Sequence, residues 1–258
     1  MPWEGGNKMA KSFLNLDKAP LTVMVQADNP DRIKELIDKS IPEGAEAFGM
    51  QLCKLKKEFR SREIYKELFS YPKDKPVYVT NYRSAENAGK SDDELAEEIL
   101  ELAECGATLC DIMGDMFDKQ SDELAVDETA IEKQMRLIDK LHEKGAEVLI
   151  SSHIYKFTPA ERVLEIALEQ QRRGADICKI VTGADTMAEQ IENMRIIALL
   201  KEKLDIPFLF LCGGECRLLR KIGAEVGNCM SLVVYEYDDF ATKVQPLLRN
   251  VKAIRDNM

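Results

Sequence analysis

Short apolar segments alternate with amphipathic segments of helical period along almost the whole of this 258-residue chain. The apolar runs, such as PVYVTNY, are rich in β-branched and aromatic residues and are typical of strands. Groups such as SDDE signal helix starts, and glycines signal helix ends. We therefore expect strands at residues 21–26, 45–52, 76–82, 107–113, 147–152, 177–181, 206–212 and 231–235. Helices are expected at residues 31–39, 62–69, 91–104, 128–144, 159–173, 186–203, 215–222 and 240–256.

Strands that are each followed by a helix predict a closed (β/α)8 barrel, the TIM barrel, as a single domain over residues 21–258. Residues 1–20 are expected to form a loose N-terminal extension. An open, doubly wound sheet is the alternative, but no G-x-G-x-x-G motif follows the first strand. In a barrel the functional side chains gather at the carboxyl ends of the strands, so we expect the site there.

The composition argues against several classes of function. A net charge of −10 disfavours a nucleic-acid partner and an anionic membrane surface. No apolar run approaches the roughly 20 residues of a membrane span, and the first residues lack the apolar core of a signal peptide, so we expect a cytoplasmic location. The seven scattered cysteines suit reduced thiols. Cys212 and Cys216 have no second ligand pair at suitable spacing, so we expect neither a metal nor a cofactor.

Two neighbouring strands carry polar side chains that suit carbonyl chemistry. His153 follows the expected strand at 147–152, and Lys179 lies within the next strand, in the sequence ICKIV. Aliphatic surroundings favour the neutral amine, which is the form that attacks carbonyl carbons. A single lysine in a strand more often extends its ammonium to solvent. The histidine one βα unit earlier favours the functional alternative, a lysine that forms a Schiff base.

These two segments resemble those of a known family. SSHIYKFTP is similar to the S-x-H-D-F-x-x-T-P segment of type I 3-dehydroquinate dehydratase, and GADICKI is similar to its A-D-I-V-K. The resemblance implies that Lys179 forms the imine and that His153 is the general acid/base. It also implies the dehydration of 3-dehydroquinate to 3-dehydroshikimate in the shikimate pathway of aromatic amino acid biosynthesis, by a homodimer.

Other matches to the family suggest further site residues. TNYRSAENAG resembles the family segment T-x-R-T-x-x-E-G-G, which implies that Glu86 hydrogen-bonds the histidine and is catalytic. RLLRKIGAEVGNCMSLV resembles the family segment whose arginine binds the substrate carboxylate. That role falls on Arg220, with Arg217 as a competing choice. Gln245 is a weaker match to the glutamine of the last loop, because the neighbouring Ser, Pro and Gly of the family are absent.

The departures from the family fall on the residues that bind the ring hydroxyls. The E-x-R-x-D motif of the second strand is replaced by Gly49, Gln51 and Cys53. The arginine of the third strand falls on Tyr82, unless a slip of one residue lets Arg83 serve. In the fourth strand Met113 replaces an acidic residue, although Asp111 is kept, and Ile154 replaces the aspartate after the histidine. We keep Gln51, Tyr82 and Arg83 as candidates for substrate binding.

Three hypotheses follow. The chain is a 3-dehydroquinate dehydratase with a divergent pocket, or an imine-forming lyase, dehydratase or aldolase of the same fold that acts on another carboxylated ketone. The altered hydroxyl-binding positions favour this second hypothesis, since removing such groups changes which substrate is preferred. The third is a non-catalytic, ligand-binding homologue, which the joint presence of His153, Lys179 and Glu86 disfavours.

Overall fold

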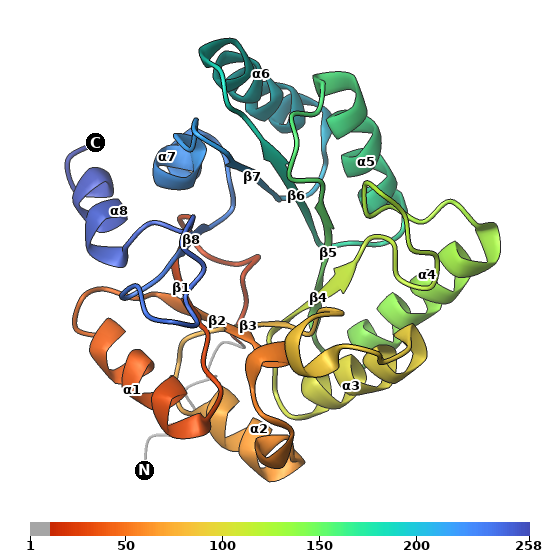
Figure 1. Cartoon of the computed structure of the whole chain (residues 1–258), viewed down its shortest axis with the longest axis vertical. Helices are drawn as coiled ribbons and strands as arrows, with labels where there is room; N and C mark the ends of the chain where they lie inside the picture. Colours follow the sequence, from red (N-terminus) through yellow and green to blue (C-terminus); the bar gives the residue numbers. More distant parts are fainter. Residues whose placement is uncertain (1–10) are drawn as a thin grey trace, which may run out of the picture.

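The computed structural model describes residues 11–258 and alternates strands with helices along the chain (Figure 1). The strands are β1 (Leu21–Val25), β2 (Ala47–Gln51), β3 (Val77–Thr80), β4 (Leu109–Met113), β5 (Glu147–His153), β6 (Ile177–Gly183), β7 (Phe208–Gly213) and β8 (Ser231–Val233). The α-helices are α1 (Pro30–Ser40), α2 (Arg62–Ser70), α3 (Asp92–Glu104), α4 (Glu128–Glu143), α5 (Ala160–Arg172), α6 (Met187–Lys203), α7 (Leu219–Val226) and α8 (Leu248–Arg255).

All strands are parallel and form a curled sheet in the order β7-β6-β5-β4-β3-β2-β1-β8. Figure 1 shows the helices following one another around the outside of this sheet. The predicted TIM-barrel-like architecture is therefore confirmed, as is the order of the strands and helices. No helix within residues 11–258 is long and apolar enough to cross a membrane.

The ring is closed between β7 and β8 by a side chain, since the described residues form no strand ladder there. Asn228 accepts a hydrogen bond from the Phe210 amide at 2.8 Å and donates one to the Phe210 carbonyl at 2.9 Å. The Cys229 amide then donates to the Phe208 carbonyl at 2.9 Å. The carboxamide of Asn228 thus takes the place of one residue of a partner strand.

The core has two layers because strand side chains alternate in direction. One layer packs between the strands and the helices, and the other fills the barrel. Phe13 belongs to the interior layer and is only 5% exposed. Its amide also donates to the Glu147 carboxylate at 2.8 Å. Residues 14–18 are exposed and residues 11–20 form no helix or strand. The N-terminal extension expected over residues 1–20 stays a prediction, and residues 1–10 lie outside the described residues.

Two helix boundaries differ from those expected. Helix α7 begins at Leu219 instead of residue 215, and α8 begins at Leu248 instead of residue 240. Residues 240–247 form a loop because Asp238 accepts hydrogen bonds from the Phe240 and Ala241 amides and fixes a turn. Pro246 has no amide hydrogen to give to a helix. This loop therefore lies over the barrel mouth, where the Thr242 amide donates to Gln26 Oε1 at 2.7 Å.

Candidate active site

A cavity of about 610 Å³ opens at the carboxyl ends of the strands. Its wall includes ends of strands far apart in sequence and the loops that follow them, as expected for a barrel of this kind. The side chains of acidic and basic residues among its lining are those of Arg83, Asp115, Lys119, Glu123, His153, Lys179 and Arg220. The sequence-based prediction of a site at this end of the barrel is therefore supported by a cavity that contains both Lys179 and His153.

Lys179 lies at the base of this cavity and is 4% exposed. Its Nζ donates to Tyr82 Oη at 2.7 Å, to Tyr78 Oη at 2.9 Å and to Asp111 Oδ2 at 3.0 Å. The ammonium is therefore fully hydrogen-bonded. Of the aliphatic neighbours expected from the sequence, Cys178 and Ile180 point to the opposite face of the strand, whereas Ile177 and Val181 lie on the interior face with Lys179.

Asp111 is the centre of this network, and its side chain is completely buried. Tyr82 donates to Asp111 Oδ2 at 2.6 Å, Tyr78 donates to the same oxygen, and Ser151 donates to Oδ1 at 2.6 Å. With Lys179, the carboxylate has four donors. A buried charge that is paired and fully hydrogen-bonded in this way is one of the few that a protein interior tolerates.

The two phenols of the network stay protonated at neutral pH. Burial, and then the negative charge of Asp111, raise the pKa of Tyr78 well above its ordinary value. The same two causes raise the pKa of Tyr82. Each phenol therefore donates its proton to Asp111 while its oxygen accepts from Lys179. Because Tyr82 lines the cavity and Tyr78 does not, only one of the two phenols faces the space where a ligand would lie.

His153 ends strand β5 and is held by Glu123 from the loop before α4. Glu123 Oε2 lies 2.8 Å from His153 Nδ1 and also accepts the His153 amide at 2.8 Å. The ring is packed between two tyrosines, edge-on to Tyr82 at 5.2 Å and stacked on Tyr155 at 5.8 Å between centroids. Nε2 makes no hydrogen bond within the described part of the chain. The imidazole is thus fixed at one nitrogen and open to the cavity at the other.

Glu123, not Glu86, is the carboxylate at the histidine in this structure. Among residues 11–258, Glu86 makes no hydrogen bond to His153 and does not line the cavity. Glu86 lies in the short 3₁₀ helix η3 (Ala85–Asn87), where its neighbour Asn87 bonds Asn81 and the Tyr82 carbonyl. Alignment to a sequence motif places a residue along the chain, but the direction of its side chain depends on the loop geometry.

The backbone at Glu123 is held in an unusual conformation. Its φ is +47°, in the left-handed region that non-glycine residues seldom adopt. The Ser152 hydroxyl donates to the Glu123 carbonyl at 2.7 Å, which ties this loop to strand β5 beside His153. Glu123 lies in the acidic stretch DKQSDELAVDE, and nothing in the composition of this stretch distinguishes it from its neighbours. Only the contact with His153 identifies it.

Arg220 and Arg217, the two candidates for carboxylate binding, differ in their positions. Arg220 is 8% exposed and lines the cavity, whereas Arg217 is exposed and does not. Arg220 Nε donates to the Cys212 carbonyl at 2.7 Å, and no carboxylate among the described residues pairs with its guanidinium. Burial lowers the pKa of Arg220, although an arginine keeps its charge in proteins. An anionic group of a ligand would supply the missing partner.

The other substrate-binding candidates all line the cavity, but they differ in what they already bind. Gln245 is 7% exposed, and its Oε1 has no hydrogen-bond partner among the described residues. Gln51 Oε1 accepts from Gln26 at 2.9 Å. Arg83 is occupied by Asp92, with two bonds of 2.7 Å, and by Asp115 at 2.6 Å. Arg83 is therefore a structural cation of the rim, and Gln245 is the candidate with free hydrogen-bonding capacity.

At the strand-two position where the family resemblance expects a glutamate, the side chain of another residue occupies the space. A Cβ at Gly49 would lie 2.2 Å from Met24 Sδ and 3.0 Å from Tyr78 Cδ1. Met24 itself lines the cavity, together with Met113 and Leu211. The wall is thus apolar at Met24, Met113 and Leu211, although Gln51 and Tyr82 also line it.

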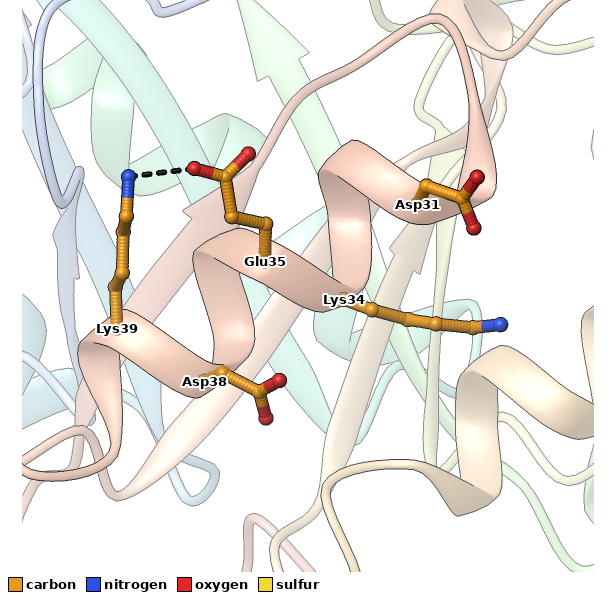
Figure 2. Close-up of a pocket in the computed structure, with 5 residues that line it drawn as sticks. All are labelled: Asp31, Lys34, Glu35, Asp38 and Lys39. Carbon is orange, nitrogen blue, oxygen red and sulfur yellow. Dashed lines mark ion pairs between the residues drawn. The ribbon is translucent and has the colours of Figure 1, made fainter.

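A second hollow lies far from these residues, on the outer face of α1. Figure 2 shows its five lining residues, Asp31, Lys34, Glu35, Asp38 and Lys39, all from one helix. Lys39 pairs with Glu35 at 2.6 Å, and Tyr71 of the neighbouring segment donates to Asp38 at 2.8 Å. The Tyr71–Asp38 hydrogen bond joins α1 to the residue that follows α2, whereas the Lys39–Glu35 pair lies within α1. Within residues 11–258, no three His, Cys, Asp or Glu side chains lie together as a metal site would require.

Comparison with known proteins gives matches in sequence. A model of the type I 3-dehydroquinase family matches residues 21–249. The curated 3-dehydroquinate dehydratase of Alkaliphilus oremlandii is 31% identical over 92 residues. This match covers 35% of the chain and 36% of the relative, so the chain spans about a third of the length of the curated relative that it matches.

Solved structures show the same fold at low identity. The type I 3-dehydroquinate dehydratase of Clostridium difficile, solved with covalent modified comenic acid, has a TM-score of 0.78 at 16% identity. The match covers 95% of this chain and 94% of that one. The 3-dehydroquinate dehydratase of Geobacillus kaustophilus also has a TM-score of 0.78, at 14% identity, over 96% of this chain and 95% of that one. The likeness extends over nearly the whole barrel.

Proposed function

This chain belongs to the type I 3-dehydroquinase family, and from this premise we propose that it dehydrates 3-dehydroquinate to 3-dehydroshikimate through an imine on Lys179. The observation that carries the proposal is the cavity that contains Lys179 and His153, on neighbouring strands, together with the unpaired Arg220. An amine, an acid/base and a carboxylate-binding cation are the groups that imine-based elimination from a carboxylated ketone requires.

The mechanism starts with attack of the Lys179 amine on the ketone carbon, which releases water and leaves a protonated imine. The imine withdraws electrons and makes the adjacent C–H bond acidic. His153 removes this proton through Nε2 and then gives it to the leaving hydroxyl group. Hydrolysis of the imine frees Lys179 and the conjugated enone. In this scheme Arg220 and Gln245 hold the substrate carboxylate.

Glu123 takes the orienting role that the sequence motif suggested for Glu86. Its contact with Nδ1 leaves Nε2 facing the cavity and stabilises the imidazolium that forms when the proton is taken up. Glu123 is therefore a positioning residue, since it acts through His153. The homodimer implied by the family resemblance and the cytoplasmic location expected from the sequence stay predictions.

A second candidate substrate class is favoured by one observation. Met24 occupies the space beside Gly49, and Met113 also lines the cavity. Gly49 and Met113 stand at positions where the family resemblance expects residues that bind the ring hydroxyls. An apolar wall disfavours ring hydroxyl groups, because they would lose their hydrogen bonds to water. An imine-forming lyase, dehydratase or aldolase that acts on a less hydroxylated carboxylated ketone would fit this wall.

The test is intact-mass measurement after incubation with 3-dehydroquinate and borohydride, followed by peptide mapping. An adduct on Lys179 with the mass of the reduced, dehydrated product supports the proposal. An adduct of undehydrated mass supports imine formation but contradicts the proposed elimination. Lys179→Ala is the control and should give no adduct. A folded protein that forms no adduct would favour another ketone acid or a binding role without turnover.

A further inference from the structure

Two tyrosines contact the reactive amine in nearly the same way, but only one of them reaches the cavity. Tyr78 and Tyr82 both accept from Lys179 Nζ, at 2.9 and 2.7 Å, and both donate to Asp111 Oδ2. Tyr78 is completely buried and does not line the cavity, whereas Tyr82 is partly exposed and does. Neither phenol has a part in the proposed chemistry so far.

Imine formation has a proton requirement that this network can meet. The hydrogen-bonded Lys179 ammonium must lose a proton before its nitrogen can attack a carbonyl carbon. The carbonyl oxygen must gain a proton to become a hydroxyl group, and it must gain another to leave as water. Asp111 is the carboxylate in contact with Nζ, and Tyr82 is the cavity-lining proton donor in contact with both Nζ and Asp111.

We propose that Tyr82 is a catalytic acid that passes protons from Lys179, by way of Asp111, to the oxygen of the substrate carbonyl. In the first step Nζ gives a proton to Asp111 Oδ2, the N–C bond forms, and the C=O π bond breaks. The carbonyl oxygen takes the phenolic proton of Tyr82, and Asp111 returns its proton to the phenolate. The product is a protonated carbinolamine, with Tyr82 and Asp111 in their starting states.

The second step uses the same route. The carbinolamine nitrogen gives a second proton to Asp111, and Tyr82 protonates the hydroxyl group, which leaves as water when the C–O bond breaks. The nitrogen lone pair forms the C=N bond, and Asp111 restores the Tyr82 phenol. For each proton that the nitrogen loses, the oxygen gains one. No external acid or base is therefore needed, and the net charge of the site is constant.

Because Tyr82 acts at the carbonyl oxygen, His153 is free to remove the proton from the carbon next to the imine. Its Nδ1 is engaged by Glu123, so it has one nitrogen for proton transfer. The ring of Tyr82 stands edge-on to the imidazole with centroids 5.2 Å apart, which places the two groups on one side of the cavity. Burial beside Asp111 raises the pKa of Tyr82 well above its ordinary value, so the phenol holds its proton until the carbonyl oxygen becomes basic.

The proton relay rests on the imine chemistry proposed above. Its test uses two ketones so that the relay and the proposed function can fail separately. Imine formation is measured as the rate of borohydride-trapped adduct on Lys179 in a single turnover, first with 3-dehydroquinate and then with pyruvate, a small keto acid. Tyr82→Phe should slow trapping with both ketones by on the order of 100-fold, the scale of general acid catalysis. It should also abolish a solvent deuterium isotope effect present in the wild type.

Tyr78→Phe is the matched control, because it removes the same hydrogen bonds to Lys179 and Asp111 without removing a donor from the cavity. Its loss should be at least about tenfold smaller than that of Tyr82→Phe, because the cavity keeps its proton donor. Equal losses in the two variants would mean that the phenols only hold the amine, and would overturn the proposal. Trapping by Tyr82→Phe at the wild-type rate would overturn it as well.

The two ketones separate the relay from the proposed reaction. If pyruvate is trapped on Lys179 with the predicted dependence on Tyr82, but 3-dehydroquinate is not dehydrated, the relay holds and the proposed substrate is wrong. If 3-dehydroquinate is dehydrated and Tyr82→Phe has no effect on trapping, the relay is wrong and the function holds. A wild-type protein that gives no Lys179 adduct with either ketone would contradict both.

Discussion

Two lysine–carboxylate pairs of similar length lie in contrasting parts of the molecule. Lys179 Nζ is 3.0 Å from Asp111 Oδ2 inside the barrel, and Lys39 Nζ is 2.6 Å from Glu35 Oε1 on the outside of α1 (Figure 2). The side chains of the first pair are 5% and 0% exposed, and those of the second are 41% and 47% exposed. The shorter pair is the weaker one, because water and salt screen it.

Burial and the number of hydrogen-bond partners, more than distance, therefore decide how much an ion pair contributes to stability. In water the Glu35 carboxylate keeps its solvation whether or not Lys39 is present. Inside the barrel, Asp111 has exchanged water for four protein donors and cannot lose one without a penalty. The His153–Glu123 pair is intermediate, with side chains 11% and 29% exposed.

Replacing Asp111 should have the largest effect. Asp111→Leu leaves the Lys179 ammonium buried without a counter-charge and should lower the free energy of unfolding by about 3–5 kcal/mol, measured by urea denaturation. Adding Lys179→Met should recover part of this loss, since the double variant removes both charges of this buried pair. Lys179→Met alone is the control that closes the double-mutant cycle. A loss below about 1 kcal/mol for Asp111→Leu would contradict the conclusion that the buried pair contributes more than the exposed pair.

The intermediate pair should affect activity more than stability. Glu123→Gln removes the charge that stabilises the His153 imidazolium, so kcat should fall by on the order of 10- to 100-fold, part of the usual contribution of acid–base catalysis. Glu86→Gln is the matched variant and should lower kcat by less than about threefold, because Glu86 does not contact His153. The reverse order of effects would restore the role that the sequence motif gave to Glu86.

A single donor to the buried carboxylate should have a smaller effect. Ser151→Ala removes the hydrogen bond from Ser151 Oγ to Asp111 Oδ1 and should lower the free energy of unfolding by about 1–3 kcal/mol. Ser70→Ala is the control, since the Ser70 residue is exposed and its hydroxyl donates, within residues 11–258, to the Glu67 carbonyl. If the two variants are equally stable by urea denaturation, the carboxylate does not depend on its full set of donors.

The exposed pair should have the smallest effect. Lys39→Ala should leave the midpoint of urea denaturation unchanged at neutral pH and 0.15 M salt. Hydrogen bonds from Lys39 and Arg32 lower the pKa of Glu35 to about 2, so any stability they bring is present above pH about 4 and is lost as the pH falls towards 2. A measurable loss at neutral pH would mean that exposure is a poor guide to the strength of these pairs.

Sequence reasoning predicted the residues on strands better than those on loops. The expectation that Lys179 and His153 lie close together rests on the convergence of parallel strand ends at one rim, and both line the cavity. Arg220 was found by motif, and the structure separates it from Arg217 by placing only Arg220 in the cavity. Glu86 and Glu123 both lie outside the strands, and there the motif pointed to Glu86 whereas the structure has Glu123 in contact with His153.

The same division holds for the fold. The order of strands and helices follows from local periodicity, turn residues and caps, which are properties of short segments. The closure between β7 and β8 by Asn228 does not, because it depends on a side chain meeting a backbone that is 18 residues away along the chain. The boundary of α8 was also misplaced, since the turn at Asp238 competes with the helix.

The sequence by itself determined that this chain forms a barrel of alternating strands and helices, with an amine and an imidazole on adjacent strands. Only the tertiary structure decided what surrounds them: two phenols and a carboxylate at Lys179, and Glu123 at His153. The physical reason is that the period of a strand fixes which side chains point inward, whereas their partners come from segments up to 101 residues away along the chain.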